Sequence, residues 1–77
     1  MPHVIVKMYP GRSEEQKRRL ADEIAKDVAE ITQCDESVVS VAIEEVESGD
    51  WADEVYRPDI LDKKQTLYKE PGYNPFE

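Results

Sequence analysis

The second residue of the chain is the clearest candidate for chemistry. The chain begins MPHVIVKMYPGRS, with Pro2 directly after Met1. Removal of Met1 would expose a prolyl secondary amine, and α-amino groups lose their proton near about pH 8, far below lysine. Such an amine accepts a proton near neutral pH, and its conjugate acid returns one. Pro2 is therefore a candidate general base and acid if Met1 is removed. If Met1 is kept, Pro2 is an amide and only the second residue of a strand.

The common signatures of other active sites are absent from the sequence. His3 is the only histidine and Cys34 the only cysteine, so an internal disulfide is excluded and a zinc site is not expected. A lone histidine on a strand is more often a surface or packing residue than a catalytic one. No phosphate-binding loop, metal-ligand cluster or serine-histidine-acid set stands out. We therefore expect no cofactor and no metal.

The elements that would position Pro2 follow from the sequence pattern. The segment at 3–8 is rich in β-branched residues and has one face more apolar than the other, which predicts a strand that Tyr9-Pro10-Gly11 ends. Ser13 and Gln16 form a capping-box pattern. After them, apolar residues recur at helical spacing and predict an amphipathic helix from about 14 to 32. The residues at 37–46 predict a second strand.

The first 46 residues thus predict an α+β fold, a β-α-β unit with parallel strands. A helical connection of this length requires a right-handed crossover between parallel strands. One helix cannot cover both faces of a two-stranded sheet. A chain this short also buries only about 60% of its unfolded surface. We therefore expect a homo-oligomer in which two units form a four-stranded sheet with the helices on one face.

The remainder of the chain is harder to interpret. The sequence predicts a turn at 48–50, a helical turn at 51–56, and a new helix that begins at Pro58 and ends at Pro71-Gly72. The aromatic residues Tyr73 and Phe76 favour docking of the tail on a partner or over a pocket. We expect one domain over residues 1–77, with a β-α-β core at 1–52 and a C-terminal helical extension at 53–77.

The formal net charge of −8 argues against nucleic acid and anionic membranes as partners. No apolar run approaches the roughly 20 residues that span a bilayer, and the N-terminus lacks an apolar signal region. We expect a cytoplasmic protein. An acidic protein that binds a carboxylate needs a local cation, so an arginine near a pocket is of interest.

Pro2, the short strand, the GRS turn and the glutamine at the head of the helix together resemble the 4-oxalocrotonate tautomerase family. The segment SVVSVAIEEV is similar to that family's second strand, and Gly49-Asp50-Trp51 to its following turn. This resemblance covers residues 2 to about 52. The extended C-terminus with PGY at 71–73 is similar to the longer, dimeric phenylpyruvate-tautomerase-like branch.

The resemblance implies a tautomerase, an isomerase that needs no cofactor and acts on a small 2-oxo acid or enol. Pro2 would be the catalytic base and acid, Arg12 would bind the acidic substrate, and Trp51 would line the pocket and lower the pKa of the proline. Ser40 stands where the family's best-known member has a second arginine. It is a candidate substrate-binding donor, and Arg57 is a candidate replacement for the missing cation.

Geometry predicts that the site is shared between subunits. About six strand residues at roughly 3.3 Å each separate Pro2 from the turn before Arg12, or about 20 Å. Arg12 would then serve the Pro2 of a neighbouring chain. We expect a dimer, because the extension could cover surfaces that a hexamer would use; a hexamer is the alternative. The alternative function is a catalytically weak or inactive dimer that binds a small molecule or a protein.

Overall fold

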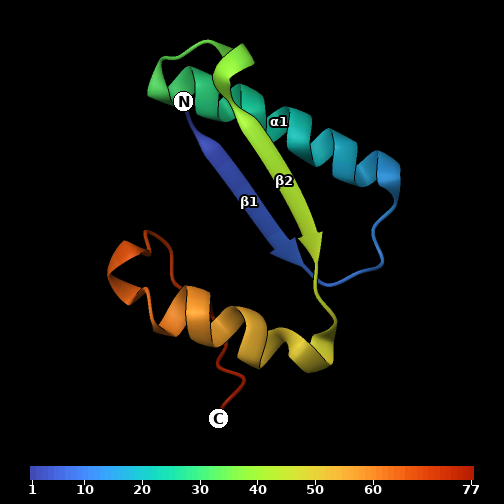
Figure 1. Cartoon of the computed structure of the whole chain (residues 1–77), viewed down its shortest axis with the longest axis vertical. Helices are drawn as coiled ribbons and strands as arrows, with labels where there is room; N and C mark the ends of the chain where they lie inside the picture. The colour runs from blue at the N-terminus through green and yellow to red at the C-terminus, as the bar shows by residue number, and fades with distance from the viewer. The chain divides into compact units, whose positions relative to one another are not determined.

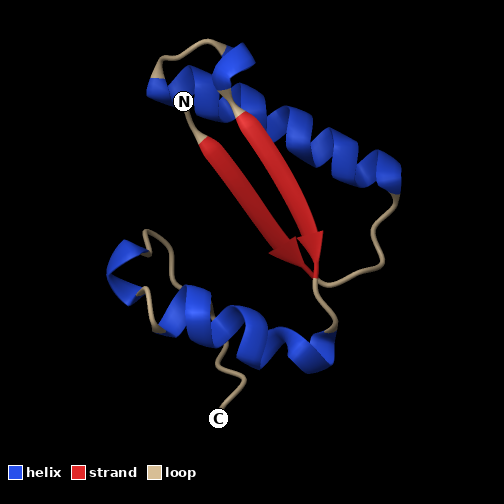
Figure 2. Cartoon of the chain, in the orientation of Figure 1, coloured by secondary structure: helices blue, strands red, loops and turns tan.

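Two parallel strands joined by one helix make up the first part of the chain. The computed structural model describes residues 1–77, which divide into two units, Met1–Glu45 and Val46–Glu77. In the first unit, strand β1 (His3–Met8), helix α1 (Glu14–Thr32) and strand β2 (Ser40–Glu45) follow one another along the chain. Both strands start at the same end of the sheet, and the loop to α1 leaves from the other (Figures 1 and 2). The predicted β-α-β unit is confirmed.

Helix α1 begins where its sequence signal predicts. The Ser13 side chain accepts a hydrogen bond from the Gln16 backbone N–H (3.1 Å), and the Gln16 side chain accepts one from the Ser13 N–H (2.9 Å). This reciprocal pair satisfies two of the free amide groups that open a helix. At the other end, Gln33 takes a left-handed conformation at φ 60°, and its N–H donates to the Ala29 carbonyl. Local signals therefore fix both ends of the helix.

Strand β2 is shorter than the sequence pattern predicts. Residues 36–38 form a single 3₁₀ turn, η1 (Glu36–Val38), instead of the first part of the strand. The Asp35 carboxylate accepts a hydrogen bond from the Ser37 N–H (2.9 Å), which caps this turn. Because this local hydrogen bond offers the backbone an alternative to the ladder, pairing begins only at Ser40. The prediction of a strand from residue 37 to residue 46 was wrong at both ends.

Strand register assigns side chains to the two faces of the sheet. His3 pairs with Ser40, and the pairing continues in step to Met8 and Glu45. Since side chains alternate along a strand, one face carries the following residues: His3, Ile5, Lys7, Ser40, Ala42 and Glu44. Helix α1 covers the opposite face, where Ala21 lines one groove together with Val41 and Ile43.

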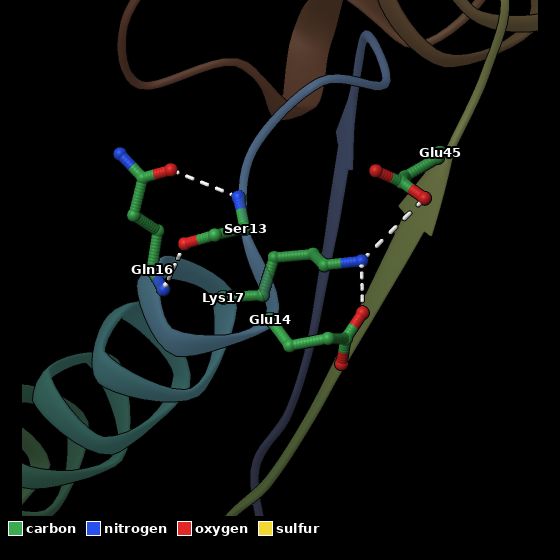
Figure 3. A network of polar contacts seen from close by, with 5 residues as sticks. All are labelled: Ser13, Glu14, Gln16, Lys17 and Glu45. Atoms are coloured by element: carbon green, nitrogen blue, oxygen red, sulfur yellow. Dashed lines mark hydrogen bonds and ion pairs between the residues drawn. The ribbon is translucent and has the colours of Figure 1, made fainter.

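A lysine connects the first turn of α1 to β2 (Figure 3). Lys17 Nζ lies 2.7 Å from Glu14 Oε1 and 3.5 Å from Glu45 Oε1. The hydrogen bond to Lys17 holds the pKa of Glu14 below its usual value. The same hydrogen bond raises the pKa of Lys17. The ion pair with Glu45 favours the observed placement of the helix start beside the end of the second strand.

The second unit is built from short, irregular helical segments. The 3₁₀ turn η2 (Ser48–Asp50) precedes the π-helix η3 (Ala52–Leu61), and a second 3₁₀ turn, η4 (Lys64–Thr66), follows. Its last residues return to η3, where the rings of Tyr56 and Phe76 meet edge to face with centroids 5.8 Å apart. The tail therefore docks on a helix of its own unit.

The prediction of a helix that starts at Pro58 was wrong. Pro58 lies inside η3, which runs from Ala52 through Arg57 to Leu61. In an α-helix the proline ring would clash with the carbonyl four residues earlier. The wider π-helical turn, seen in the hydrogen bond from the Asp62 N–H to the Arg57 carbonyl (2.9 Å), accommodates it. The chain also does not continue as one helix to Pro71: only the 3₁₀ turn η4 follows η3, and Tyr68 beyond it is fully exposed.

Burial is concentrated in the second unit. Val55 and Tyr56 are the only buried residues, each 5% exposed. In the first unit no residue of either strand or of α1 is fully buried, and Ile31 is 78% exposed. The β-α-β unit has therefore no closed core within one chain. None of the helices combines the length and apolar composition that a bilayer crossing requires.

Candidate active site

Pro2 stands at the head of the parallel sheet, and its backbone is part of the ladder. The Ser40 N–H donates a hydrogen bond to the Pro2 carbonyl (3.1 Å), one residue before the register of β1 begins. The Pro2 side chain is half-buried, whereas Met1 is fully exposed. Proline suits this position because it leaves no ladder amide without a partner. The backbone thus holds the nitrogen of residue 2 at a defined corner of the sheet.

Ser40 brings a side-chain group to the same corner. Its hydroxyl oxygen lies 2.6 Å from His3 Nδ1, across the two strands. The register places both side chains on the sheet face away from α1. His3 therefore has a specific partner, which its sequence context did not indicate. Only the strand register could have predicted this contact, because it is the register that places His3 opposite Ser40.

Arg12 lies beyond the opposite end of β1. The loop turns at Gly11, whose φ of 125° is a conformation that other residues rarely adopt. Arg12 follows this glycine, is exposed and makes no hydrogen bond or ion pair. The strand length between it and Pro2, about 20 Å at roughly 3.3 Å per residue, keeps the two apart within one chain. Within the first unit, the structure brings Ser40 to Pro2 but leaves Arg12 at the other end.

Trp51 belongs to the second unit, directly before η3. Its indole Nε1–H donates a hydrogen bond to the Tyr73 hydroxyl oxygen (2.8 Å), and its side chain is half-buried. Tyr56 holds the same tail residue by a hydrogen bond from its hydroxyl to the Tyr73 carbonyl (3.2 Å). The sequence pointed to Trp51, and to Tyr73 as a residue through which the tail could dock, but not to the contact between the two.

Arg57, the candidate replacement for the missing cation, is engaged by groups of its own unit. Its guanidinium carbon lies 4.6 Å from the centre of the Phe76 ring, within the range of a cation–π contact. Its Nη2 lies 3.7 Å from Asp53 Oδ1, one helical turn earlier. These contacts hold the arginine against η3 and the tail.

The 3₁₀ turn that precedes Ser40 is capped by a carboxylate, that of Asp35. The Ser37 N–H bonded to the Asp35 carboxylate lowers the pKa of that carboxyl, and the Ser37 side chain adds to the effect. The capped turn then delivers the chain into β2 at Ser40. No group of three or more histidine, cysteine, aspartate or glutamate side chains forms a metal-binding arrangement. The side-chain groups that the structure brings to the corner beside Pro2 are the imidazole of His3 and the hydroxyl of Ser40.

Known proteins similar to this chain are tautomerases. A model of the family described as tautomerase enzyme matches residues 2–57. A probable tautomerase of Xylella fastidiosa is 47% identical over 73 residues, which cover 95% of this chain and 89% of that protein. Tautomerase PptA of Cronobacter sakazakii is 40% identical over 74 residues, or 95% of this chain and 97% of that protein.

Solved structures match the same part of the fold. YwhB, described as a homologue of 4-oxalocrotonate tautomerase, is 43% identical to this chain and superimposes with a TM-score of 0.58. That match covers 60% of this chain and 75% of YwhB. Unfused 4-OT in its apo form is 24% identical with a TM-score of 0.62, over 64% of this chain and 80% of its own, and shows likeness of fold alone.

Proposed function

The chain belongs to the 4-oxalocrotonate tautomerase family of isomerases, and we propose that it catalyses keto-enol proton transfer on a small 2-oxo acid. The amino-terminal nitrogen of Pro2, exposed after removal of Met1, is the general base and acid. The observation that carries this proposal is the corner at which the Ser40 N–H holds the Pro2 carbonyl. The small residue Pro2 directly after Met1 supports its removal, because this is a context in which the initiator methionine is commonly removed.

The reaction needs one group that both accepts and returns a proton. The neutral Pro2 amine takes the proton of the enol hydroxyl, which leaves an enolate and a prolinium. The prolinium then protonates the adjacent carbon, either directly or through a water molecule whose hydroxide takes the prolinium proton, and the product is the 2-oxo acid with no net change in the enzyme. An α-amino group suits both steps, because its pKa of about 8 lies close to neutral pH.

Arg12 is proposed to bind the substrate carboxylate in a site of a neighbouring subunit. Its guanidinium is exposed and can make a bidentate contact with a carboxylate. The length of β1 separates it from the Pro2 of its own chain. A homo-oligomer, for which a dimer is our proposal, also supplies partners for the apolar side chains that the β-α-β unit leaves exposed, such as Ile5 and Ile31.

Ser40 is proposed to donate a hydrogen bond to the oxygen that gains charge in the enolate. If His3 Nδ1 carries a proton, it donates to Ser40 Oγ at 2.6 Å and leaves the hydroxyl proton for the substrate. A neutral donor aimed at developing charge stabilises the transition state less than an arginine does, but requires no counter-ion. Trp51 is proposed to line the pocket.

Pro2→Ala, prepared so that the chain starts at residue 2, tests the base directly. Ketonisation of phenylenolpyruvate, followed by its ultraviolet absorbance, should fall by about 100-fold or more in kcat/KM, the lower range for loss of a general base. Mass spectrometry of the native protein checks the loss of Met1. A form proven to start at Pro2 that transfers no proton would overturn the proposal and favour a binding protein.

Mixing two inactive variants tests the shared site. Pro2→Ala and Arg12→Ala chains, unfolded together and refolded, form mixed dimers with one intact site and one doubly altered site. Random pairing should restore about a quarter of wild-type activity, because half of the dimers are mixed and each has one working site. Arg19→Ala, an exposed arginine of α1, is the matched control and should be fully active. No recovery in proven mixed dimers would contradict the sharing of Arg12.

A further inference from the structure

Tyr73 contacts the only tryptophan of the chain through a single polar group. The Trp51 indole N–H donates to the Tyr73 hydroxyl at 2.8 Å, across 22 positions of sequence. An indole has one hydrogen-bond donor and no acceptor. A fixed acceptor at that distance therefore selects one orientation of the ring from those that its two side-chain torsions allow.

Tyr73 is itself held on the buried part of its unit. Its carbonyl accepts the hydroxyl of Tyr56, and the two rings lie 5.4 Å apart at a tilt of 57°. Tyr56 is 5% exposed and cannot move without opening the unit. The Phe76 ring also packs against the Tyr56 ring, edge to face at 5.8 Å, and the Arg57 guanidinium lies over the Phe76 ring. These contacts hold the tail at Tyr73 and Phe76 and restrict the positions open to the hydroxyl that accepts from the indole.

We propose that Tyr73 is a positioning residue that fixes the Trp51 indole in the orientation in which it lines the substrate pocket. This inference rests on the proposed function, which gives Trp51 its place in the pocket. Tyr73 does not touch the reacting atoms and acts only through the indole. The C-terminal extension then contributes to substrate fit as well as to folding. An indole that is already ordered before the substrate binds avoids the loss of conformational entropy that a mobile side chain would add to binding.

Tyr73→Phe removes the acceptor and keeps the ring. In a ¹H–¹⁵N spectrum, the single indole N–H resonance should move upfield, and its exchange with solvent should accelerate about 5- to 10-fold, as expected for loss of one hydrogen bond. KM for phenylenolpyruvate should rise by about 3- to 10-fold with kcat nearly unchanged, because binding and not proton transfer is affected.

Tyr68→Phe is the matched control, since Tyr68 is fully exposed. It should leave the indole resonance, KM and kcat at their wild-type values. Circular dichroism of both variants checks that the helical content is retained. If Tyr73→Phe unfolds the tail, tyrosine replaced by 4-fluorophenylalanine at position 73, which fills more of the hydroxyl's space, provides the second variant.

The two readouts separate failure of this inference from failure of the proposed function. An unchanged indole resonance in Tyr73→Phe would overturn the inference and leave the Pro2 mechanism untouched. A shifted resonance with unchanged KM would also overturn it, because the contact would then serve only the fold. Wild-type protein that starts at Pro2 and lacks activity would overturn the proposed function, and with it the role of Trp51 in a pocket.

Discussion

The two units of this chain are stabilised in opposite ways. The β-α-β unit has regular hydrogen bonding, a capped helix and an in-register pair of strands, yet no residue of its strands or of α1 is fully buried. The second unit has irregular helices but contains both buried residues, Val55 and Tyr56. Backbone geometry specifies the first unit, and side-chain packing specifies the second. The contrast explains why the corner at Pro2 is defined by backbone pairing, whereas the indole of Trp51 is defined by an aromatic cluster.

Tyr56→Ala should give the largest effect, because it removes a buried ring and the support of the tail. We expect the free energy of unfolding to fall by about 3 kcal/mol, at the lower end for loss of a buried aromatic side chain. Urea titration at fixed protein concentration should show Trp51 fluorescence changing at lower urea than the helical circular dichroism. Tyr68→Ala, at a fully exposed position, is the control and should be neutral within about 0.5 kcal/mol. Coincident and unshifted transitions would refute the packing of the second unit.

Ser13→Ala should have a smaller effect, confined to the first unit. It deletes the side-chain oxygen that accepts from the Gln16 N–H and should lower the free energy of unfolding by about 1 kcal/mol. The destabilisation should appear as a lower urea midpoint of the circular dichroism signal at 222 nm. The Trp51 fluorescence of the folded protein should be unchanged. Ser48→Ala is the control, because no side-chain cap is present at η2. If Ser13→Ala and Ser48→Ala lowered the free energy of unfolding equally, the capping box would not stabilise α1 as proposed.

The smallest effect is expected at the ion pairs of Lys17. The pKa of Glu14 is lowered by its hydrogen bond to Lys17, so this stabilisation is present above the usual glutamate pKa and is lost as the pH falls through the lowered value. The pKa of Lys17 is raised, so the stabilisation from its charge is lost only as the pH rises above the usual lysine pKa.

Lys17→Met should therefore lower the urea midpoint at pH 7, and the difference from wild type should vanish once the pH falls below the lowered pKa of Glu14. Lys26→Met is the control, since its contact with Glu23 at 3.9 Å is exposed on both sides. A difference that persists unchanged at low pH would show that Lys17 acts by packing and not by charge.

The sequence predictions were more accurate for the β-α-β unit than for the second unit. The first strand and α1 lie at the residues that their patterns predict, because alternation, proline-glycine turns and the Ser13–Gln16 box act within a few residues. Strand β2 begins later than predicted because Asp35 caps a competing turn. The C-terminal prediction failed at Pro58, where local rules for an α-helix do not describe a π-helix stabilised by packing around Tyr56.

Some residues of the candidate site were identified from the sequence, and one contact was found only in the structure. Pro2 and the GRS turn with Arg12 were identified from the sequence, and the length of β1 places them at opposite ends of the strand in the structure. The hydrogen bond between His3 and Ser40 was missed, because it depends on a register that joins residues 37 positions apart. The assignment of catalytic and substrate-binding roles to Pro2, Arg12, Ser40 and Trp51 stays a prediction until the variants are measured.

The sequence alone determined the family, the β-α-β order, the helix with its cap and the residue that could act as a base. These are properties of composition and of spacing over a few residues, and each has its own physical signal. Only the tertiary structure decided that Ser40 and His3 meet beside Pro2, that η3 passes through Pro58, and that Tyr73 holds Trp51. Those features come from contacts between residues far apart in the chain, where strand register and the burial of one tyrosine ring outweigh local preference.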